Sequence, residues 1–139
     1  MNLPQIAVTW QPRILGLLRI ATAFLLLQHG TAKLLGFPHV AMFDGMRFLS
    51  LLGFAGILEF AGGVLLLLGI YTRPVAFILS GEMAVAYWQF HAPKAFWPVQ
   101  NQGVPAVLFC FLFLYMAAQG GGDWSLDGLI RRKRRALGK

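Results

Sequence analysis

Long apolar stretches dominate this chain of 139 residues and leave few folds open to it. A membrane-spanning helix needs about 20 mostly apolar residues, because the hydrocarbon core is about 30 Å thick. Four stretches approach that length, and turn-forming residues such as Gly36-Phe37-Pro38 and Tyr71-Thr72-Arg73-Pro74 separate them. A strict rule that forbids charges would accept only the fourth stretch. We expect four spans, because the segments between the charges are too apolar for water. The sequence therefore predicts an all-α, integral membrane four-helix bundle with spans at about 13–35, 47–70, 74–91 and 103–119.

The low content of charged residues supports this interpretation, and the clustering of basic residues near the C-terminus separates a tail from the rest of the chain. Only 12% of the residues are charged and 58% are hydrophobic, whereas an ordinary soluble domain carries about 25% charged residues. The net charge of +7 arises mostly from a tail with six of the 12 basic residues. We therefore predict a transmembrane domain at 1–130 and a basic cytoplasmic tail at 131–139. The tail is a topology signal, a segment for anionic lipid, or both, and a nucleic-acid partner is not expected.

Lysine and arginine residues also predict the orientation, because they are retained on the cytoplasmic side. With four spans, Arg13, Arg73 and the tail share one side and contribute eight basic residues. The opposite side has three, at Lys33, Arg47 and Lys94. We therefore expect a multi-pass protein of the bacterial inner membrane with both termini in the cytoplasm.

Three charged residues are expected deep inside the predicted spans. Counted from the cytoplasmic ends, Arg19, Glu82 and Glu59 lie about 9, 12 and 17 Å into the membrane. Such groups are costly in hydrocarbon and need a partner or a function. We expect Arg19 to pair with one of the acids, either as a structural ion pair or so that the other acid can carry a proton. The remaining alternative is that these side chains snorkel to the membrane surface or contact lipid. Gly56 and Gly63 flank Glu59 on its helix face, which would let a neighbouring helix approach closely.

A second polar group is predicted near the outer surface, formed by His29, Lys33, Gln89 and Asn101. It is either an ordinary interfacial helix end or a pocket for a carbonyl or an anionic headgroup, such as a quinone. No metal site is predicted, because His29, His39 and His91 lack ligand spacing. The single cysteine, Cys110, rules out an intrachain disulfide and a cysteine-built metal site.

Motifs along nearly the whole chain resemble the DoxX family of small four-helix bacterial and archaeal membrane proteins. The matching pieces are Arg19 with Gln28-His29-Gly30 and Lys33-Leu34, then Glu59-Phe60-Ala61-Gly62-Gly63, Leu68-Gly69-Ile70-Tyr71-Thr72-Arg73, Asn101-Gln102-Gly103 and Gly120-Gly121-Gly122-Asp123-Trp124-Ser125-Leu126-Asp127. Many members carry an acid shortly after the Asn-x-Gly element, but this chain continues Gly103-Val104-Pro105, so a role of that acid does not transfer. Ser125 and Asp127 are expected to turn the chain at the interface, because both are capping residues.

The resemblance implies a subunit or anchor of a quinone-linked or other redox system, since the family includes a subunit of thiosulfate:quinone oxidoreductase. Two alternatives stay open: a small-solute transporter or permeability element with Glu59 and Glu82 as proton sites, and a non-catalytic membrane scaffold. No covalently bound cofactor is expected, and a quinone is the candidate ligand. The expected partners are the lipid bilayer, a membrane or soluble oxidoreductase, and further copies of the chain. Whether the chain is itself an enzyme is left open.

Overall fold

The computed structural model describes residues 2–138, and these residues form helices and loops without a β-strand. This confirms the predicted all-α class. The elements in chain order are α1 (Leu3–Leu35), the short 3-10 helix η1 (Ala41–Phe43), α2 (Leu51–Leu68), α3 (Thr72–Ala86), the π-helix η2 (Tyr87–His91), α4 (Pro98–Asn101), α5 (Val104–Gln119) and α6 (Leu126–Ala136).

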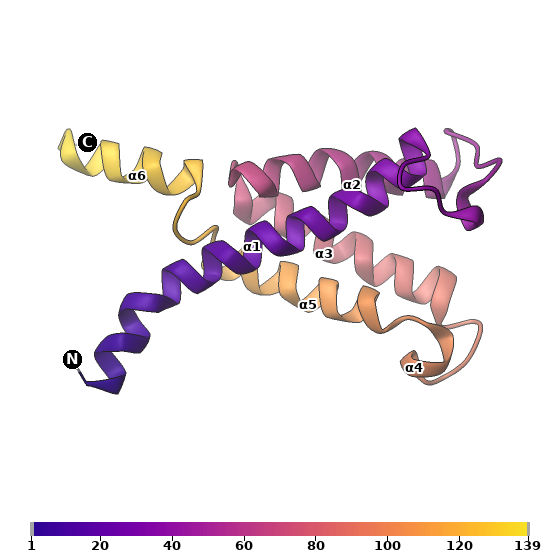
Figure 1. The fold of residues 1–139 in the computed structure, drawn as a ribbon, viewed down its shortest axis with the longest axis horizontal. Coiled ribbons are helices and arrows are strands. Elements are labelled where there is room, and N and C mark those ends of the chain that lie inside the picture. Colours follow the sequence, from indigo (N-terminus) through magenta and orange to yellow (C-terminus); the bar gives the residue numbers. More distant parts are fainter. Residues whose placement is uncertain (1, 139) are drawn as a thin grey trace.

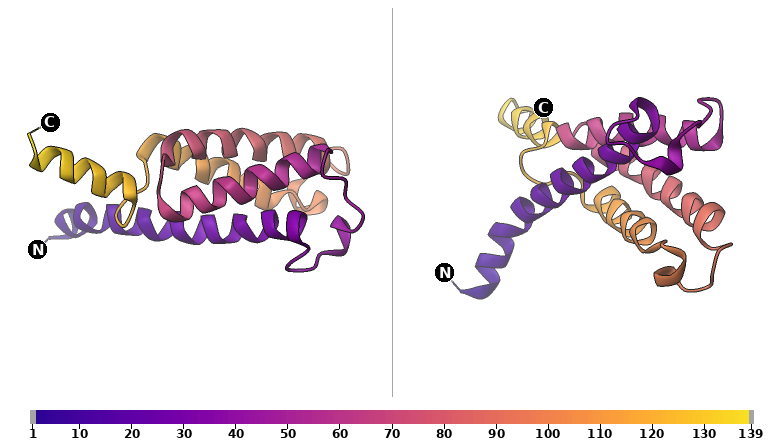
Figure 2. Two further views of the ribbon diagram at one scale, coloured as in Figure 1. Left: turned by 90° about the horizontal axis from the view of Figure 1, so that it is seen from above. Right: turned by 45° about the vertical axis from the view of Figure 1, so that its right-hand side comes forward.

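The long helices α1, α2, α3 and α5 lie side by side (Figures 1 and 2). The most extensive contacts join α1 to α2 and α3 to α5, and α2 packs against α3 to connect the two pairs. Their shared core is apolar. Its members include Leu15, Ala23, Leu26, Leu66, Ala76, Leu79, Met83, Phe113 and Met116. Many large apolar side chains on the outer faces of the helices are exposed, as expected for a bundle surrounded by lipid.

Capping residues explain where α2 and α6 begin and where α2 ends. The side chain of Ser50 accepts a hydrogen bond from the backbone N–H of Gly53, and Ser125 does the same for Gly128. The turn predicted at Ser125 is thereby confirmed. Gly69 ends α2 with a φ of 69°, a left-handed conformation that costs glycine little. The chain then enters α3 after only two further residues, so α2 and α3 are neighbours.

The helix bounds differ from the predicted spans at several points. α1 begins at Leu3 rather than near residue 13, with Asn2 as its N-cap. α2 begins at Leu51 rather than 47, because Ser50 bonds back to the carbonyl of Arg47 in a turn that precedes the helix. α6 continues across residue 131, so the basic tail is part of a helix that starts at Leu126.

Two helices in the described part of the chain, α1 and α2, are long and apolar enough to cross a membrane by length and composition alone. α5 is equally apolar in character but has 16 residues. α3 has 15 residues and continues directly into η2. The four-span arrangement therefore stays a prediction.

Both termini lie at the same end of the bundle, beside the turn between α2 and α3 (Figures 1 and 2). The loop from residue 36 to 50 and the segment from 92 to 103, which contains α4, lie at the opposite end. We call these the terminal end and the loop end.

Candidate functional site

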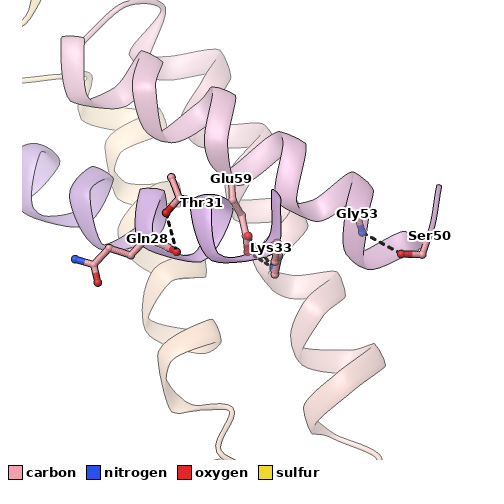
Figure 3. Close-up of polar contacts among 6 residues, drawn as sticks. All are labelled: Gln28, Thr31, Lys33, Ser50, Gly53 and Glu59. Carbon is pink, nitrogen blue, oxygen red and sulfur yellow. Dashed lines mark hydrogen bonds and ion pairs between the residues drawn. The ribbon is translucent and has the colours of Figure 1, made fainter. Parts of the chain in front are cut away.

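A buried ion pair joins α1 to α2 (Figure 3). The Lys33 ammonium lies 2.7 Å from both carboxylate oxygens of Glu59 and donates to each of them. Only 11% of the Lys33 side chain and 6% of the Glu59 side chain are exposed. The Lys33 Nζ atom also lies 5.5 Å from the centre of the Phe43 ring, at the loop end. The nearby Gln28 side chain extends away from the pair (Figure 3).

Glycine residues let the two backbones come close enough for this pair to form. A Cβ atom added at Gly30 would lie 2.5 Å from the backbone nitrogen of Phe60, next to Glu59. Gly56 faces the Lys33 side chain, and Gly63 faces Leu27. The expectation that Gly56 and Gly63 admit a neighbouring helix beside Glu59 is confirmed, and that helix is α1.

Glu82 on α3 adds a second carboxyl group to this region. Both of its carboxylate oxygens are buried, and neither has a hydrogen-bond partner among residues 2–138. The side chain lies within electrostatic range of Glu59 and Lys33. His29 on α1 is in turn within electrostatic range of Glu59. We call Lys33, Glu59 and Glu82 the buried charge cluster.

The expected pairing of Arg19 with Glu59 or Glu82 is wrong. Arg19 is fully buried, and its guanidinium donates to backbone carbonyls instead. One terminal nitrogen donates to Leu66 at 2.5 Å and to Leu67 at 2.7 Å, at the last turn of α2. The Nε atom donates to Gly121 at 2.9 Å, and the other terminal nitrogen to Trp124 at 3.0 Å.

The direction of the helices explains this partner choice. Helical side chains lean toward the N-terminus of their own helix, and α1 and α2 run in opposite directions. Lys33 and Glu59 therefore lean toward each other, whereas Arg19 leans toward the terminal end. There it meets the C-terminal carbonyls of α2, which have no partner within the helix and carry partial negative charge. The expected pairing of Arg19 rested on the depth of each residue along its span. It did not include the direction in which each side chain leans.

The predicted outer-side group is not assembled as one pocket. His29 is exposed and packs edge-on near Phe109 of α5, with the ring centres 6.4 Å apart. Gln89 is exposed. Asn101 is buried, but its side chain is engaged by its own loop: it donates to the Ala95 carbonyl at 2.9 Å and accepts from the Gly103 N–H at 2.7 Å.

Lys33 therefore belongs with the two acids rather than with the outer-side residues. Sequence reasoning missed this, because it assigned Lys33 to the membrane surface by its position alone. It expected Asp127 only as a local capping residue, whereas the Asp127 carboxylate accepts from the backbone N–H groups of Tyr71 at 3.0 Å and Thr72 at 2.8 Å. This bond fastens the start of α6 to the start of α3. A contact across 55 residues leaves no local signal in a single sequence.

Comparison with known proteins agrees with the residue pattern. The model of the DoxX family matches residues 14–92. An uncharacterized protein of Haemophilus influenzae is 41% identical over 129 residues, which cover 89% of this chain and 96% of the relative. Inner membrane protein YqjF of Escherichia coli is 28% identical over 125 residues, or 83% of this chain and 90% of the relative. No solved structure matches the chain.

Proposed function

Because the chain belongs to the DoxX family of membrane proteins, we propose that it is a subunit or anchor of a quinone-linked redox system. In this proposal α1, α2, α3 with η2, and α5 each cross the bacterial inner membrane. The 18 residues of α2 correspond to about 27 Å and the 16 residues of α5 to about 24 Å, close to the hydrocarbon thickness of about 30 Å. The terminal end faces the cytoplasm, because most of the basic residues lie there.

The observation that carries the proposal is the Glu82 carboxyl group, whose two oxygens are buried without a hydrogen-bond partner in the described chain. A buried carboxylate without a donor is costly, and more so inside a membrane. Lys33 does not relieve this cost, because its hydrogen bonds go to Glu59 and none of them reaches Glu82. Glu82 therefore holds a proton, which it can give to or take from a ligand.

A quinone fits the chemistry of these residues. A quinone accepts electrons and protons at its carbonyl oxygens, which are hydrogen-bond acceptors. The protonated Glu82 carboxyl can donate to such an oxygen, and the Lys33 ammonium has three N–H groups. A quinone is also lipid-soluble, which suits a cluster that lies between apolar helices. The role of this chain is then to orient the ligand and to hold or release a proton at the Glu82 oxygens.

Electrons would come from a partner. A cysteine-held iron–sulfur cluster uses four thiolates, and the chain contains one cysteine. We therefore propose that a membrane or soluble oxidoreductase docks on this protein and exchanges electrons with the quinone. This accounts for a redox-linked subunit whose own sequence carries no electron-transfer motif.

Titration of the purified protein in detergent with a short-chain quinone tests the proposal. The variant Glu82→Leu removes the carboxyl group and leaves no hydrogen-bond donor on this side chain. We expect its quinone affinity to fall about tenfold, the usual effect of losing a hydrogen bond to a strongly polar group. Gln28→Ala is the control, because this side chain extends away from the cluster (Figure 3). Unchanged binding in Glu82→Leu, or no binding to the parent protein, would rule out the quinone site.

A further inference from the structure

A pocket lies at the terminal end of the bundle, outside the buried charge cluster. It encloses about 580 Å³ between the turn that joins α2 to α3, the glycine segment after α5, and α6. Ligand pockets commonly enclose about 300–1,000 Å³, so a small polar group with part of an attached chain fits. Nothing in the proposed quinone site uses this pocket.

Three arginines give the pocket a positive charge. Arg73 comes from the start of α3, and Arg131 and Arg134 come from α6. The arginines on α6 are three residues apart, so they project from the same face of the helix. Asp127 also lines the pocket, but both of its oxygens accept backbone N–H bonds from Tyr71 and Thr72. Three guanidinium groups therefore remain available to an anion.

The rest of the lining is largely apolar. Ile70 contributes from the α2–α3 connection and Pro74 from the first turn of α3, and Leu126 and Ile130 contribute from α6. Leu126 and Ile130 are four residues apart and share a helix face. α6 is thus amphipathic, with an apolar face beside basic residues, a pattern typical of helices that lie at a membrane surface. The pocket combines arginines with apolar side chains at the end of a membrane bundle.

We propose that this pocket binds the phosphodiester headgroup of an anionic glycerophospholipid. Arginine suits this ligand, because its planar guanidinium donates paired hydrogen bonds to phosphate oxygens. The apolar lining favours a lipid over free phosphate, since glycerol and the first acyl carbons can contact Ile70 and Ile130. Bound lipid would hold α6 along the bilayer surface and fix the end of the bundle to the anionic leaflet.

Native mass spectrometry of the full-length protein in neutral detergent tests this inference with phosphatidylglycerol and phosphatidylcholine as added lipids. Individual lipids in a neutral micelle present no charged bilayer surface, so general attraction of the tail contributes little. We expect phosphatidylglycerol to bind and phosphatidylcholine to bind much more weakly. Arg131→Gln/Arg134→Gln should lower the affinity for phosphatidylglycerol by roughly 30-fold.

Lys133→Gln/Arg135→Gln is the matched control. It removes the same charge from the same helix, but neither residue lines the pocket, and it leaves Arg132 paired with Asp123. We expect this control to retain most of the affinity of the parent. Thermal unfolding of both variants checks that the bundle stays folded. Equal losses in the two double variants would contradict the inference, because they would indicate a general charge effect.

Inorganic phosphate and glycerol phosphate separate a lipid from a soluble anion. We expect neither of them, at millimolar concentration, to displace phosphatidylglycerol. Displacement at that concentration would overturn the assignment to a lipid and indicate a soluble phosphate site. Arg73→Gln extends the test to the other wall of the pocket and should also weaken lipid binding. Full affinity in Arg73→Gln would contradict the pocket, because binding would then involve α6 alone.

Discussion

Arg19 shows how one buried charge can hold a membrane bundle together without an acidic partner. Its guanidinium joins the last turn of α2 to the segment between Gly121 and Trp124. The Leu66 carbonyl also accepts from the backbone N–H of Gly69, and buried carbonyls at a helix end need such donors. The nearest compensating charges are the C-terminal end of the α2 dipole and Asp127, which lies within electrostatic range.

Replacing Arg19 by methionine should destabilise the protein by about 3 kcal/mol or more, because several buried carbonyls lose their donor. Arg19→Lys should restore part of the loss, since one ammonium cannot reach all four carbonyls. Thermal unfolding in detergent measures both effects. Arg13→Gln is the control, because Arg13 is exposed and lies over the Trp10 ring. A methionine variant as stable as this control would contradict a structural role for Arg19.

The Lys33–Glu59 ion pair leads to a second prediction about the effect of single residues on stability. Lys33→Met alone should cost about 3–5 kcal/mol, because it leaves Glu59 buried and unpaired. The double variant Lys33→Met/Glu59→Leu should recover much of this loss, since no unpaired charge remains. A double-mutant cycle of unfolding free energies measures the coupling. Additive effects of the two single substitutions would show that the pair does not act as a unit.

At the scale of elements, the close contact between α1 and α2 depends on glycine residues, because they have no side chain to keep the two backbones apart. Gly30 lies against the backbone of Phe60, and Gly63 lies against Leu27. Helices in a membrane gain little from the hydrophobic effect, so close van der Waals packing is a main source of their association. This close approach is also what places Lys33 within reach of Glu59.

Gly30→Ala should therefore destabilise the bundle, by about 1–3 kcal/mol, the usual cost of overpacking. Gly81→Ala in α3 is a matched control, because nothing lies within 4 Å of a Cβ atom added there. Alanine favours a helix over glycine, so the control should be neutral or slightly stabilising. Equal destabilisation by both substitutions, measured by thermal unfolding, would argue against the close contact.

At the scale of the whole molecule, the two ends of the bundle differ in charge. The terminal end carries α6 and the arginines of the lipid pocket, and the loop end carries only a few basic residues. The 33 residues of α1 correspond to about 50 Å, well beyond the hydrocarbon thickness of about 30 Å. In the proposed four-span arrangement, α1 therefore extends past the hydrocarbon on the terminal side, in line with its early start at Leu3.

This arrangement predicts which residues can be labelled in intact cells. Cys110→Ala removes the only cysteine, and a new cysteine can then report on either end. Met42→Cys at the exposed loop end should react with an impermeant maleimide in intact cells. Arg135→Cys on α6 should react only after the membrane is permeabilised. The reverse pattern would contradict the proposed orientation with cytoplasmic termini.

Much of the element-level structure could be predicted from the sequence, because it depends on local physics. Apolar runs and capping residues indicate the long helices and the turn at Ser125, and small residues beside Glu59 indicate a close helix contact. The start of α1 was missed, because residues 3–12 are too polar in places to be read as a span. Only a search for helix caps at Asn2 would have indicated it.

The sequence by itself determined that the chain is an all-helical DoxX-like protein with buried charges. Only the tertiary structure decided which charges meet. Pairing depends on the opposite direction of α1 and α2, on the lean of each side chain, and on which carbonyls lack donors. These are relations between residues far apart in the chain, so no local pattern encodes them. For that reason Lys33 joins Glu59, Glu82 lacks a partner in the described chain, and Arg19 binds backbone at the other end of the bundle.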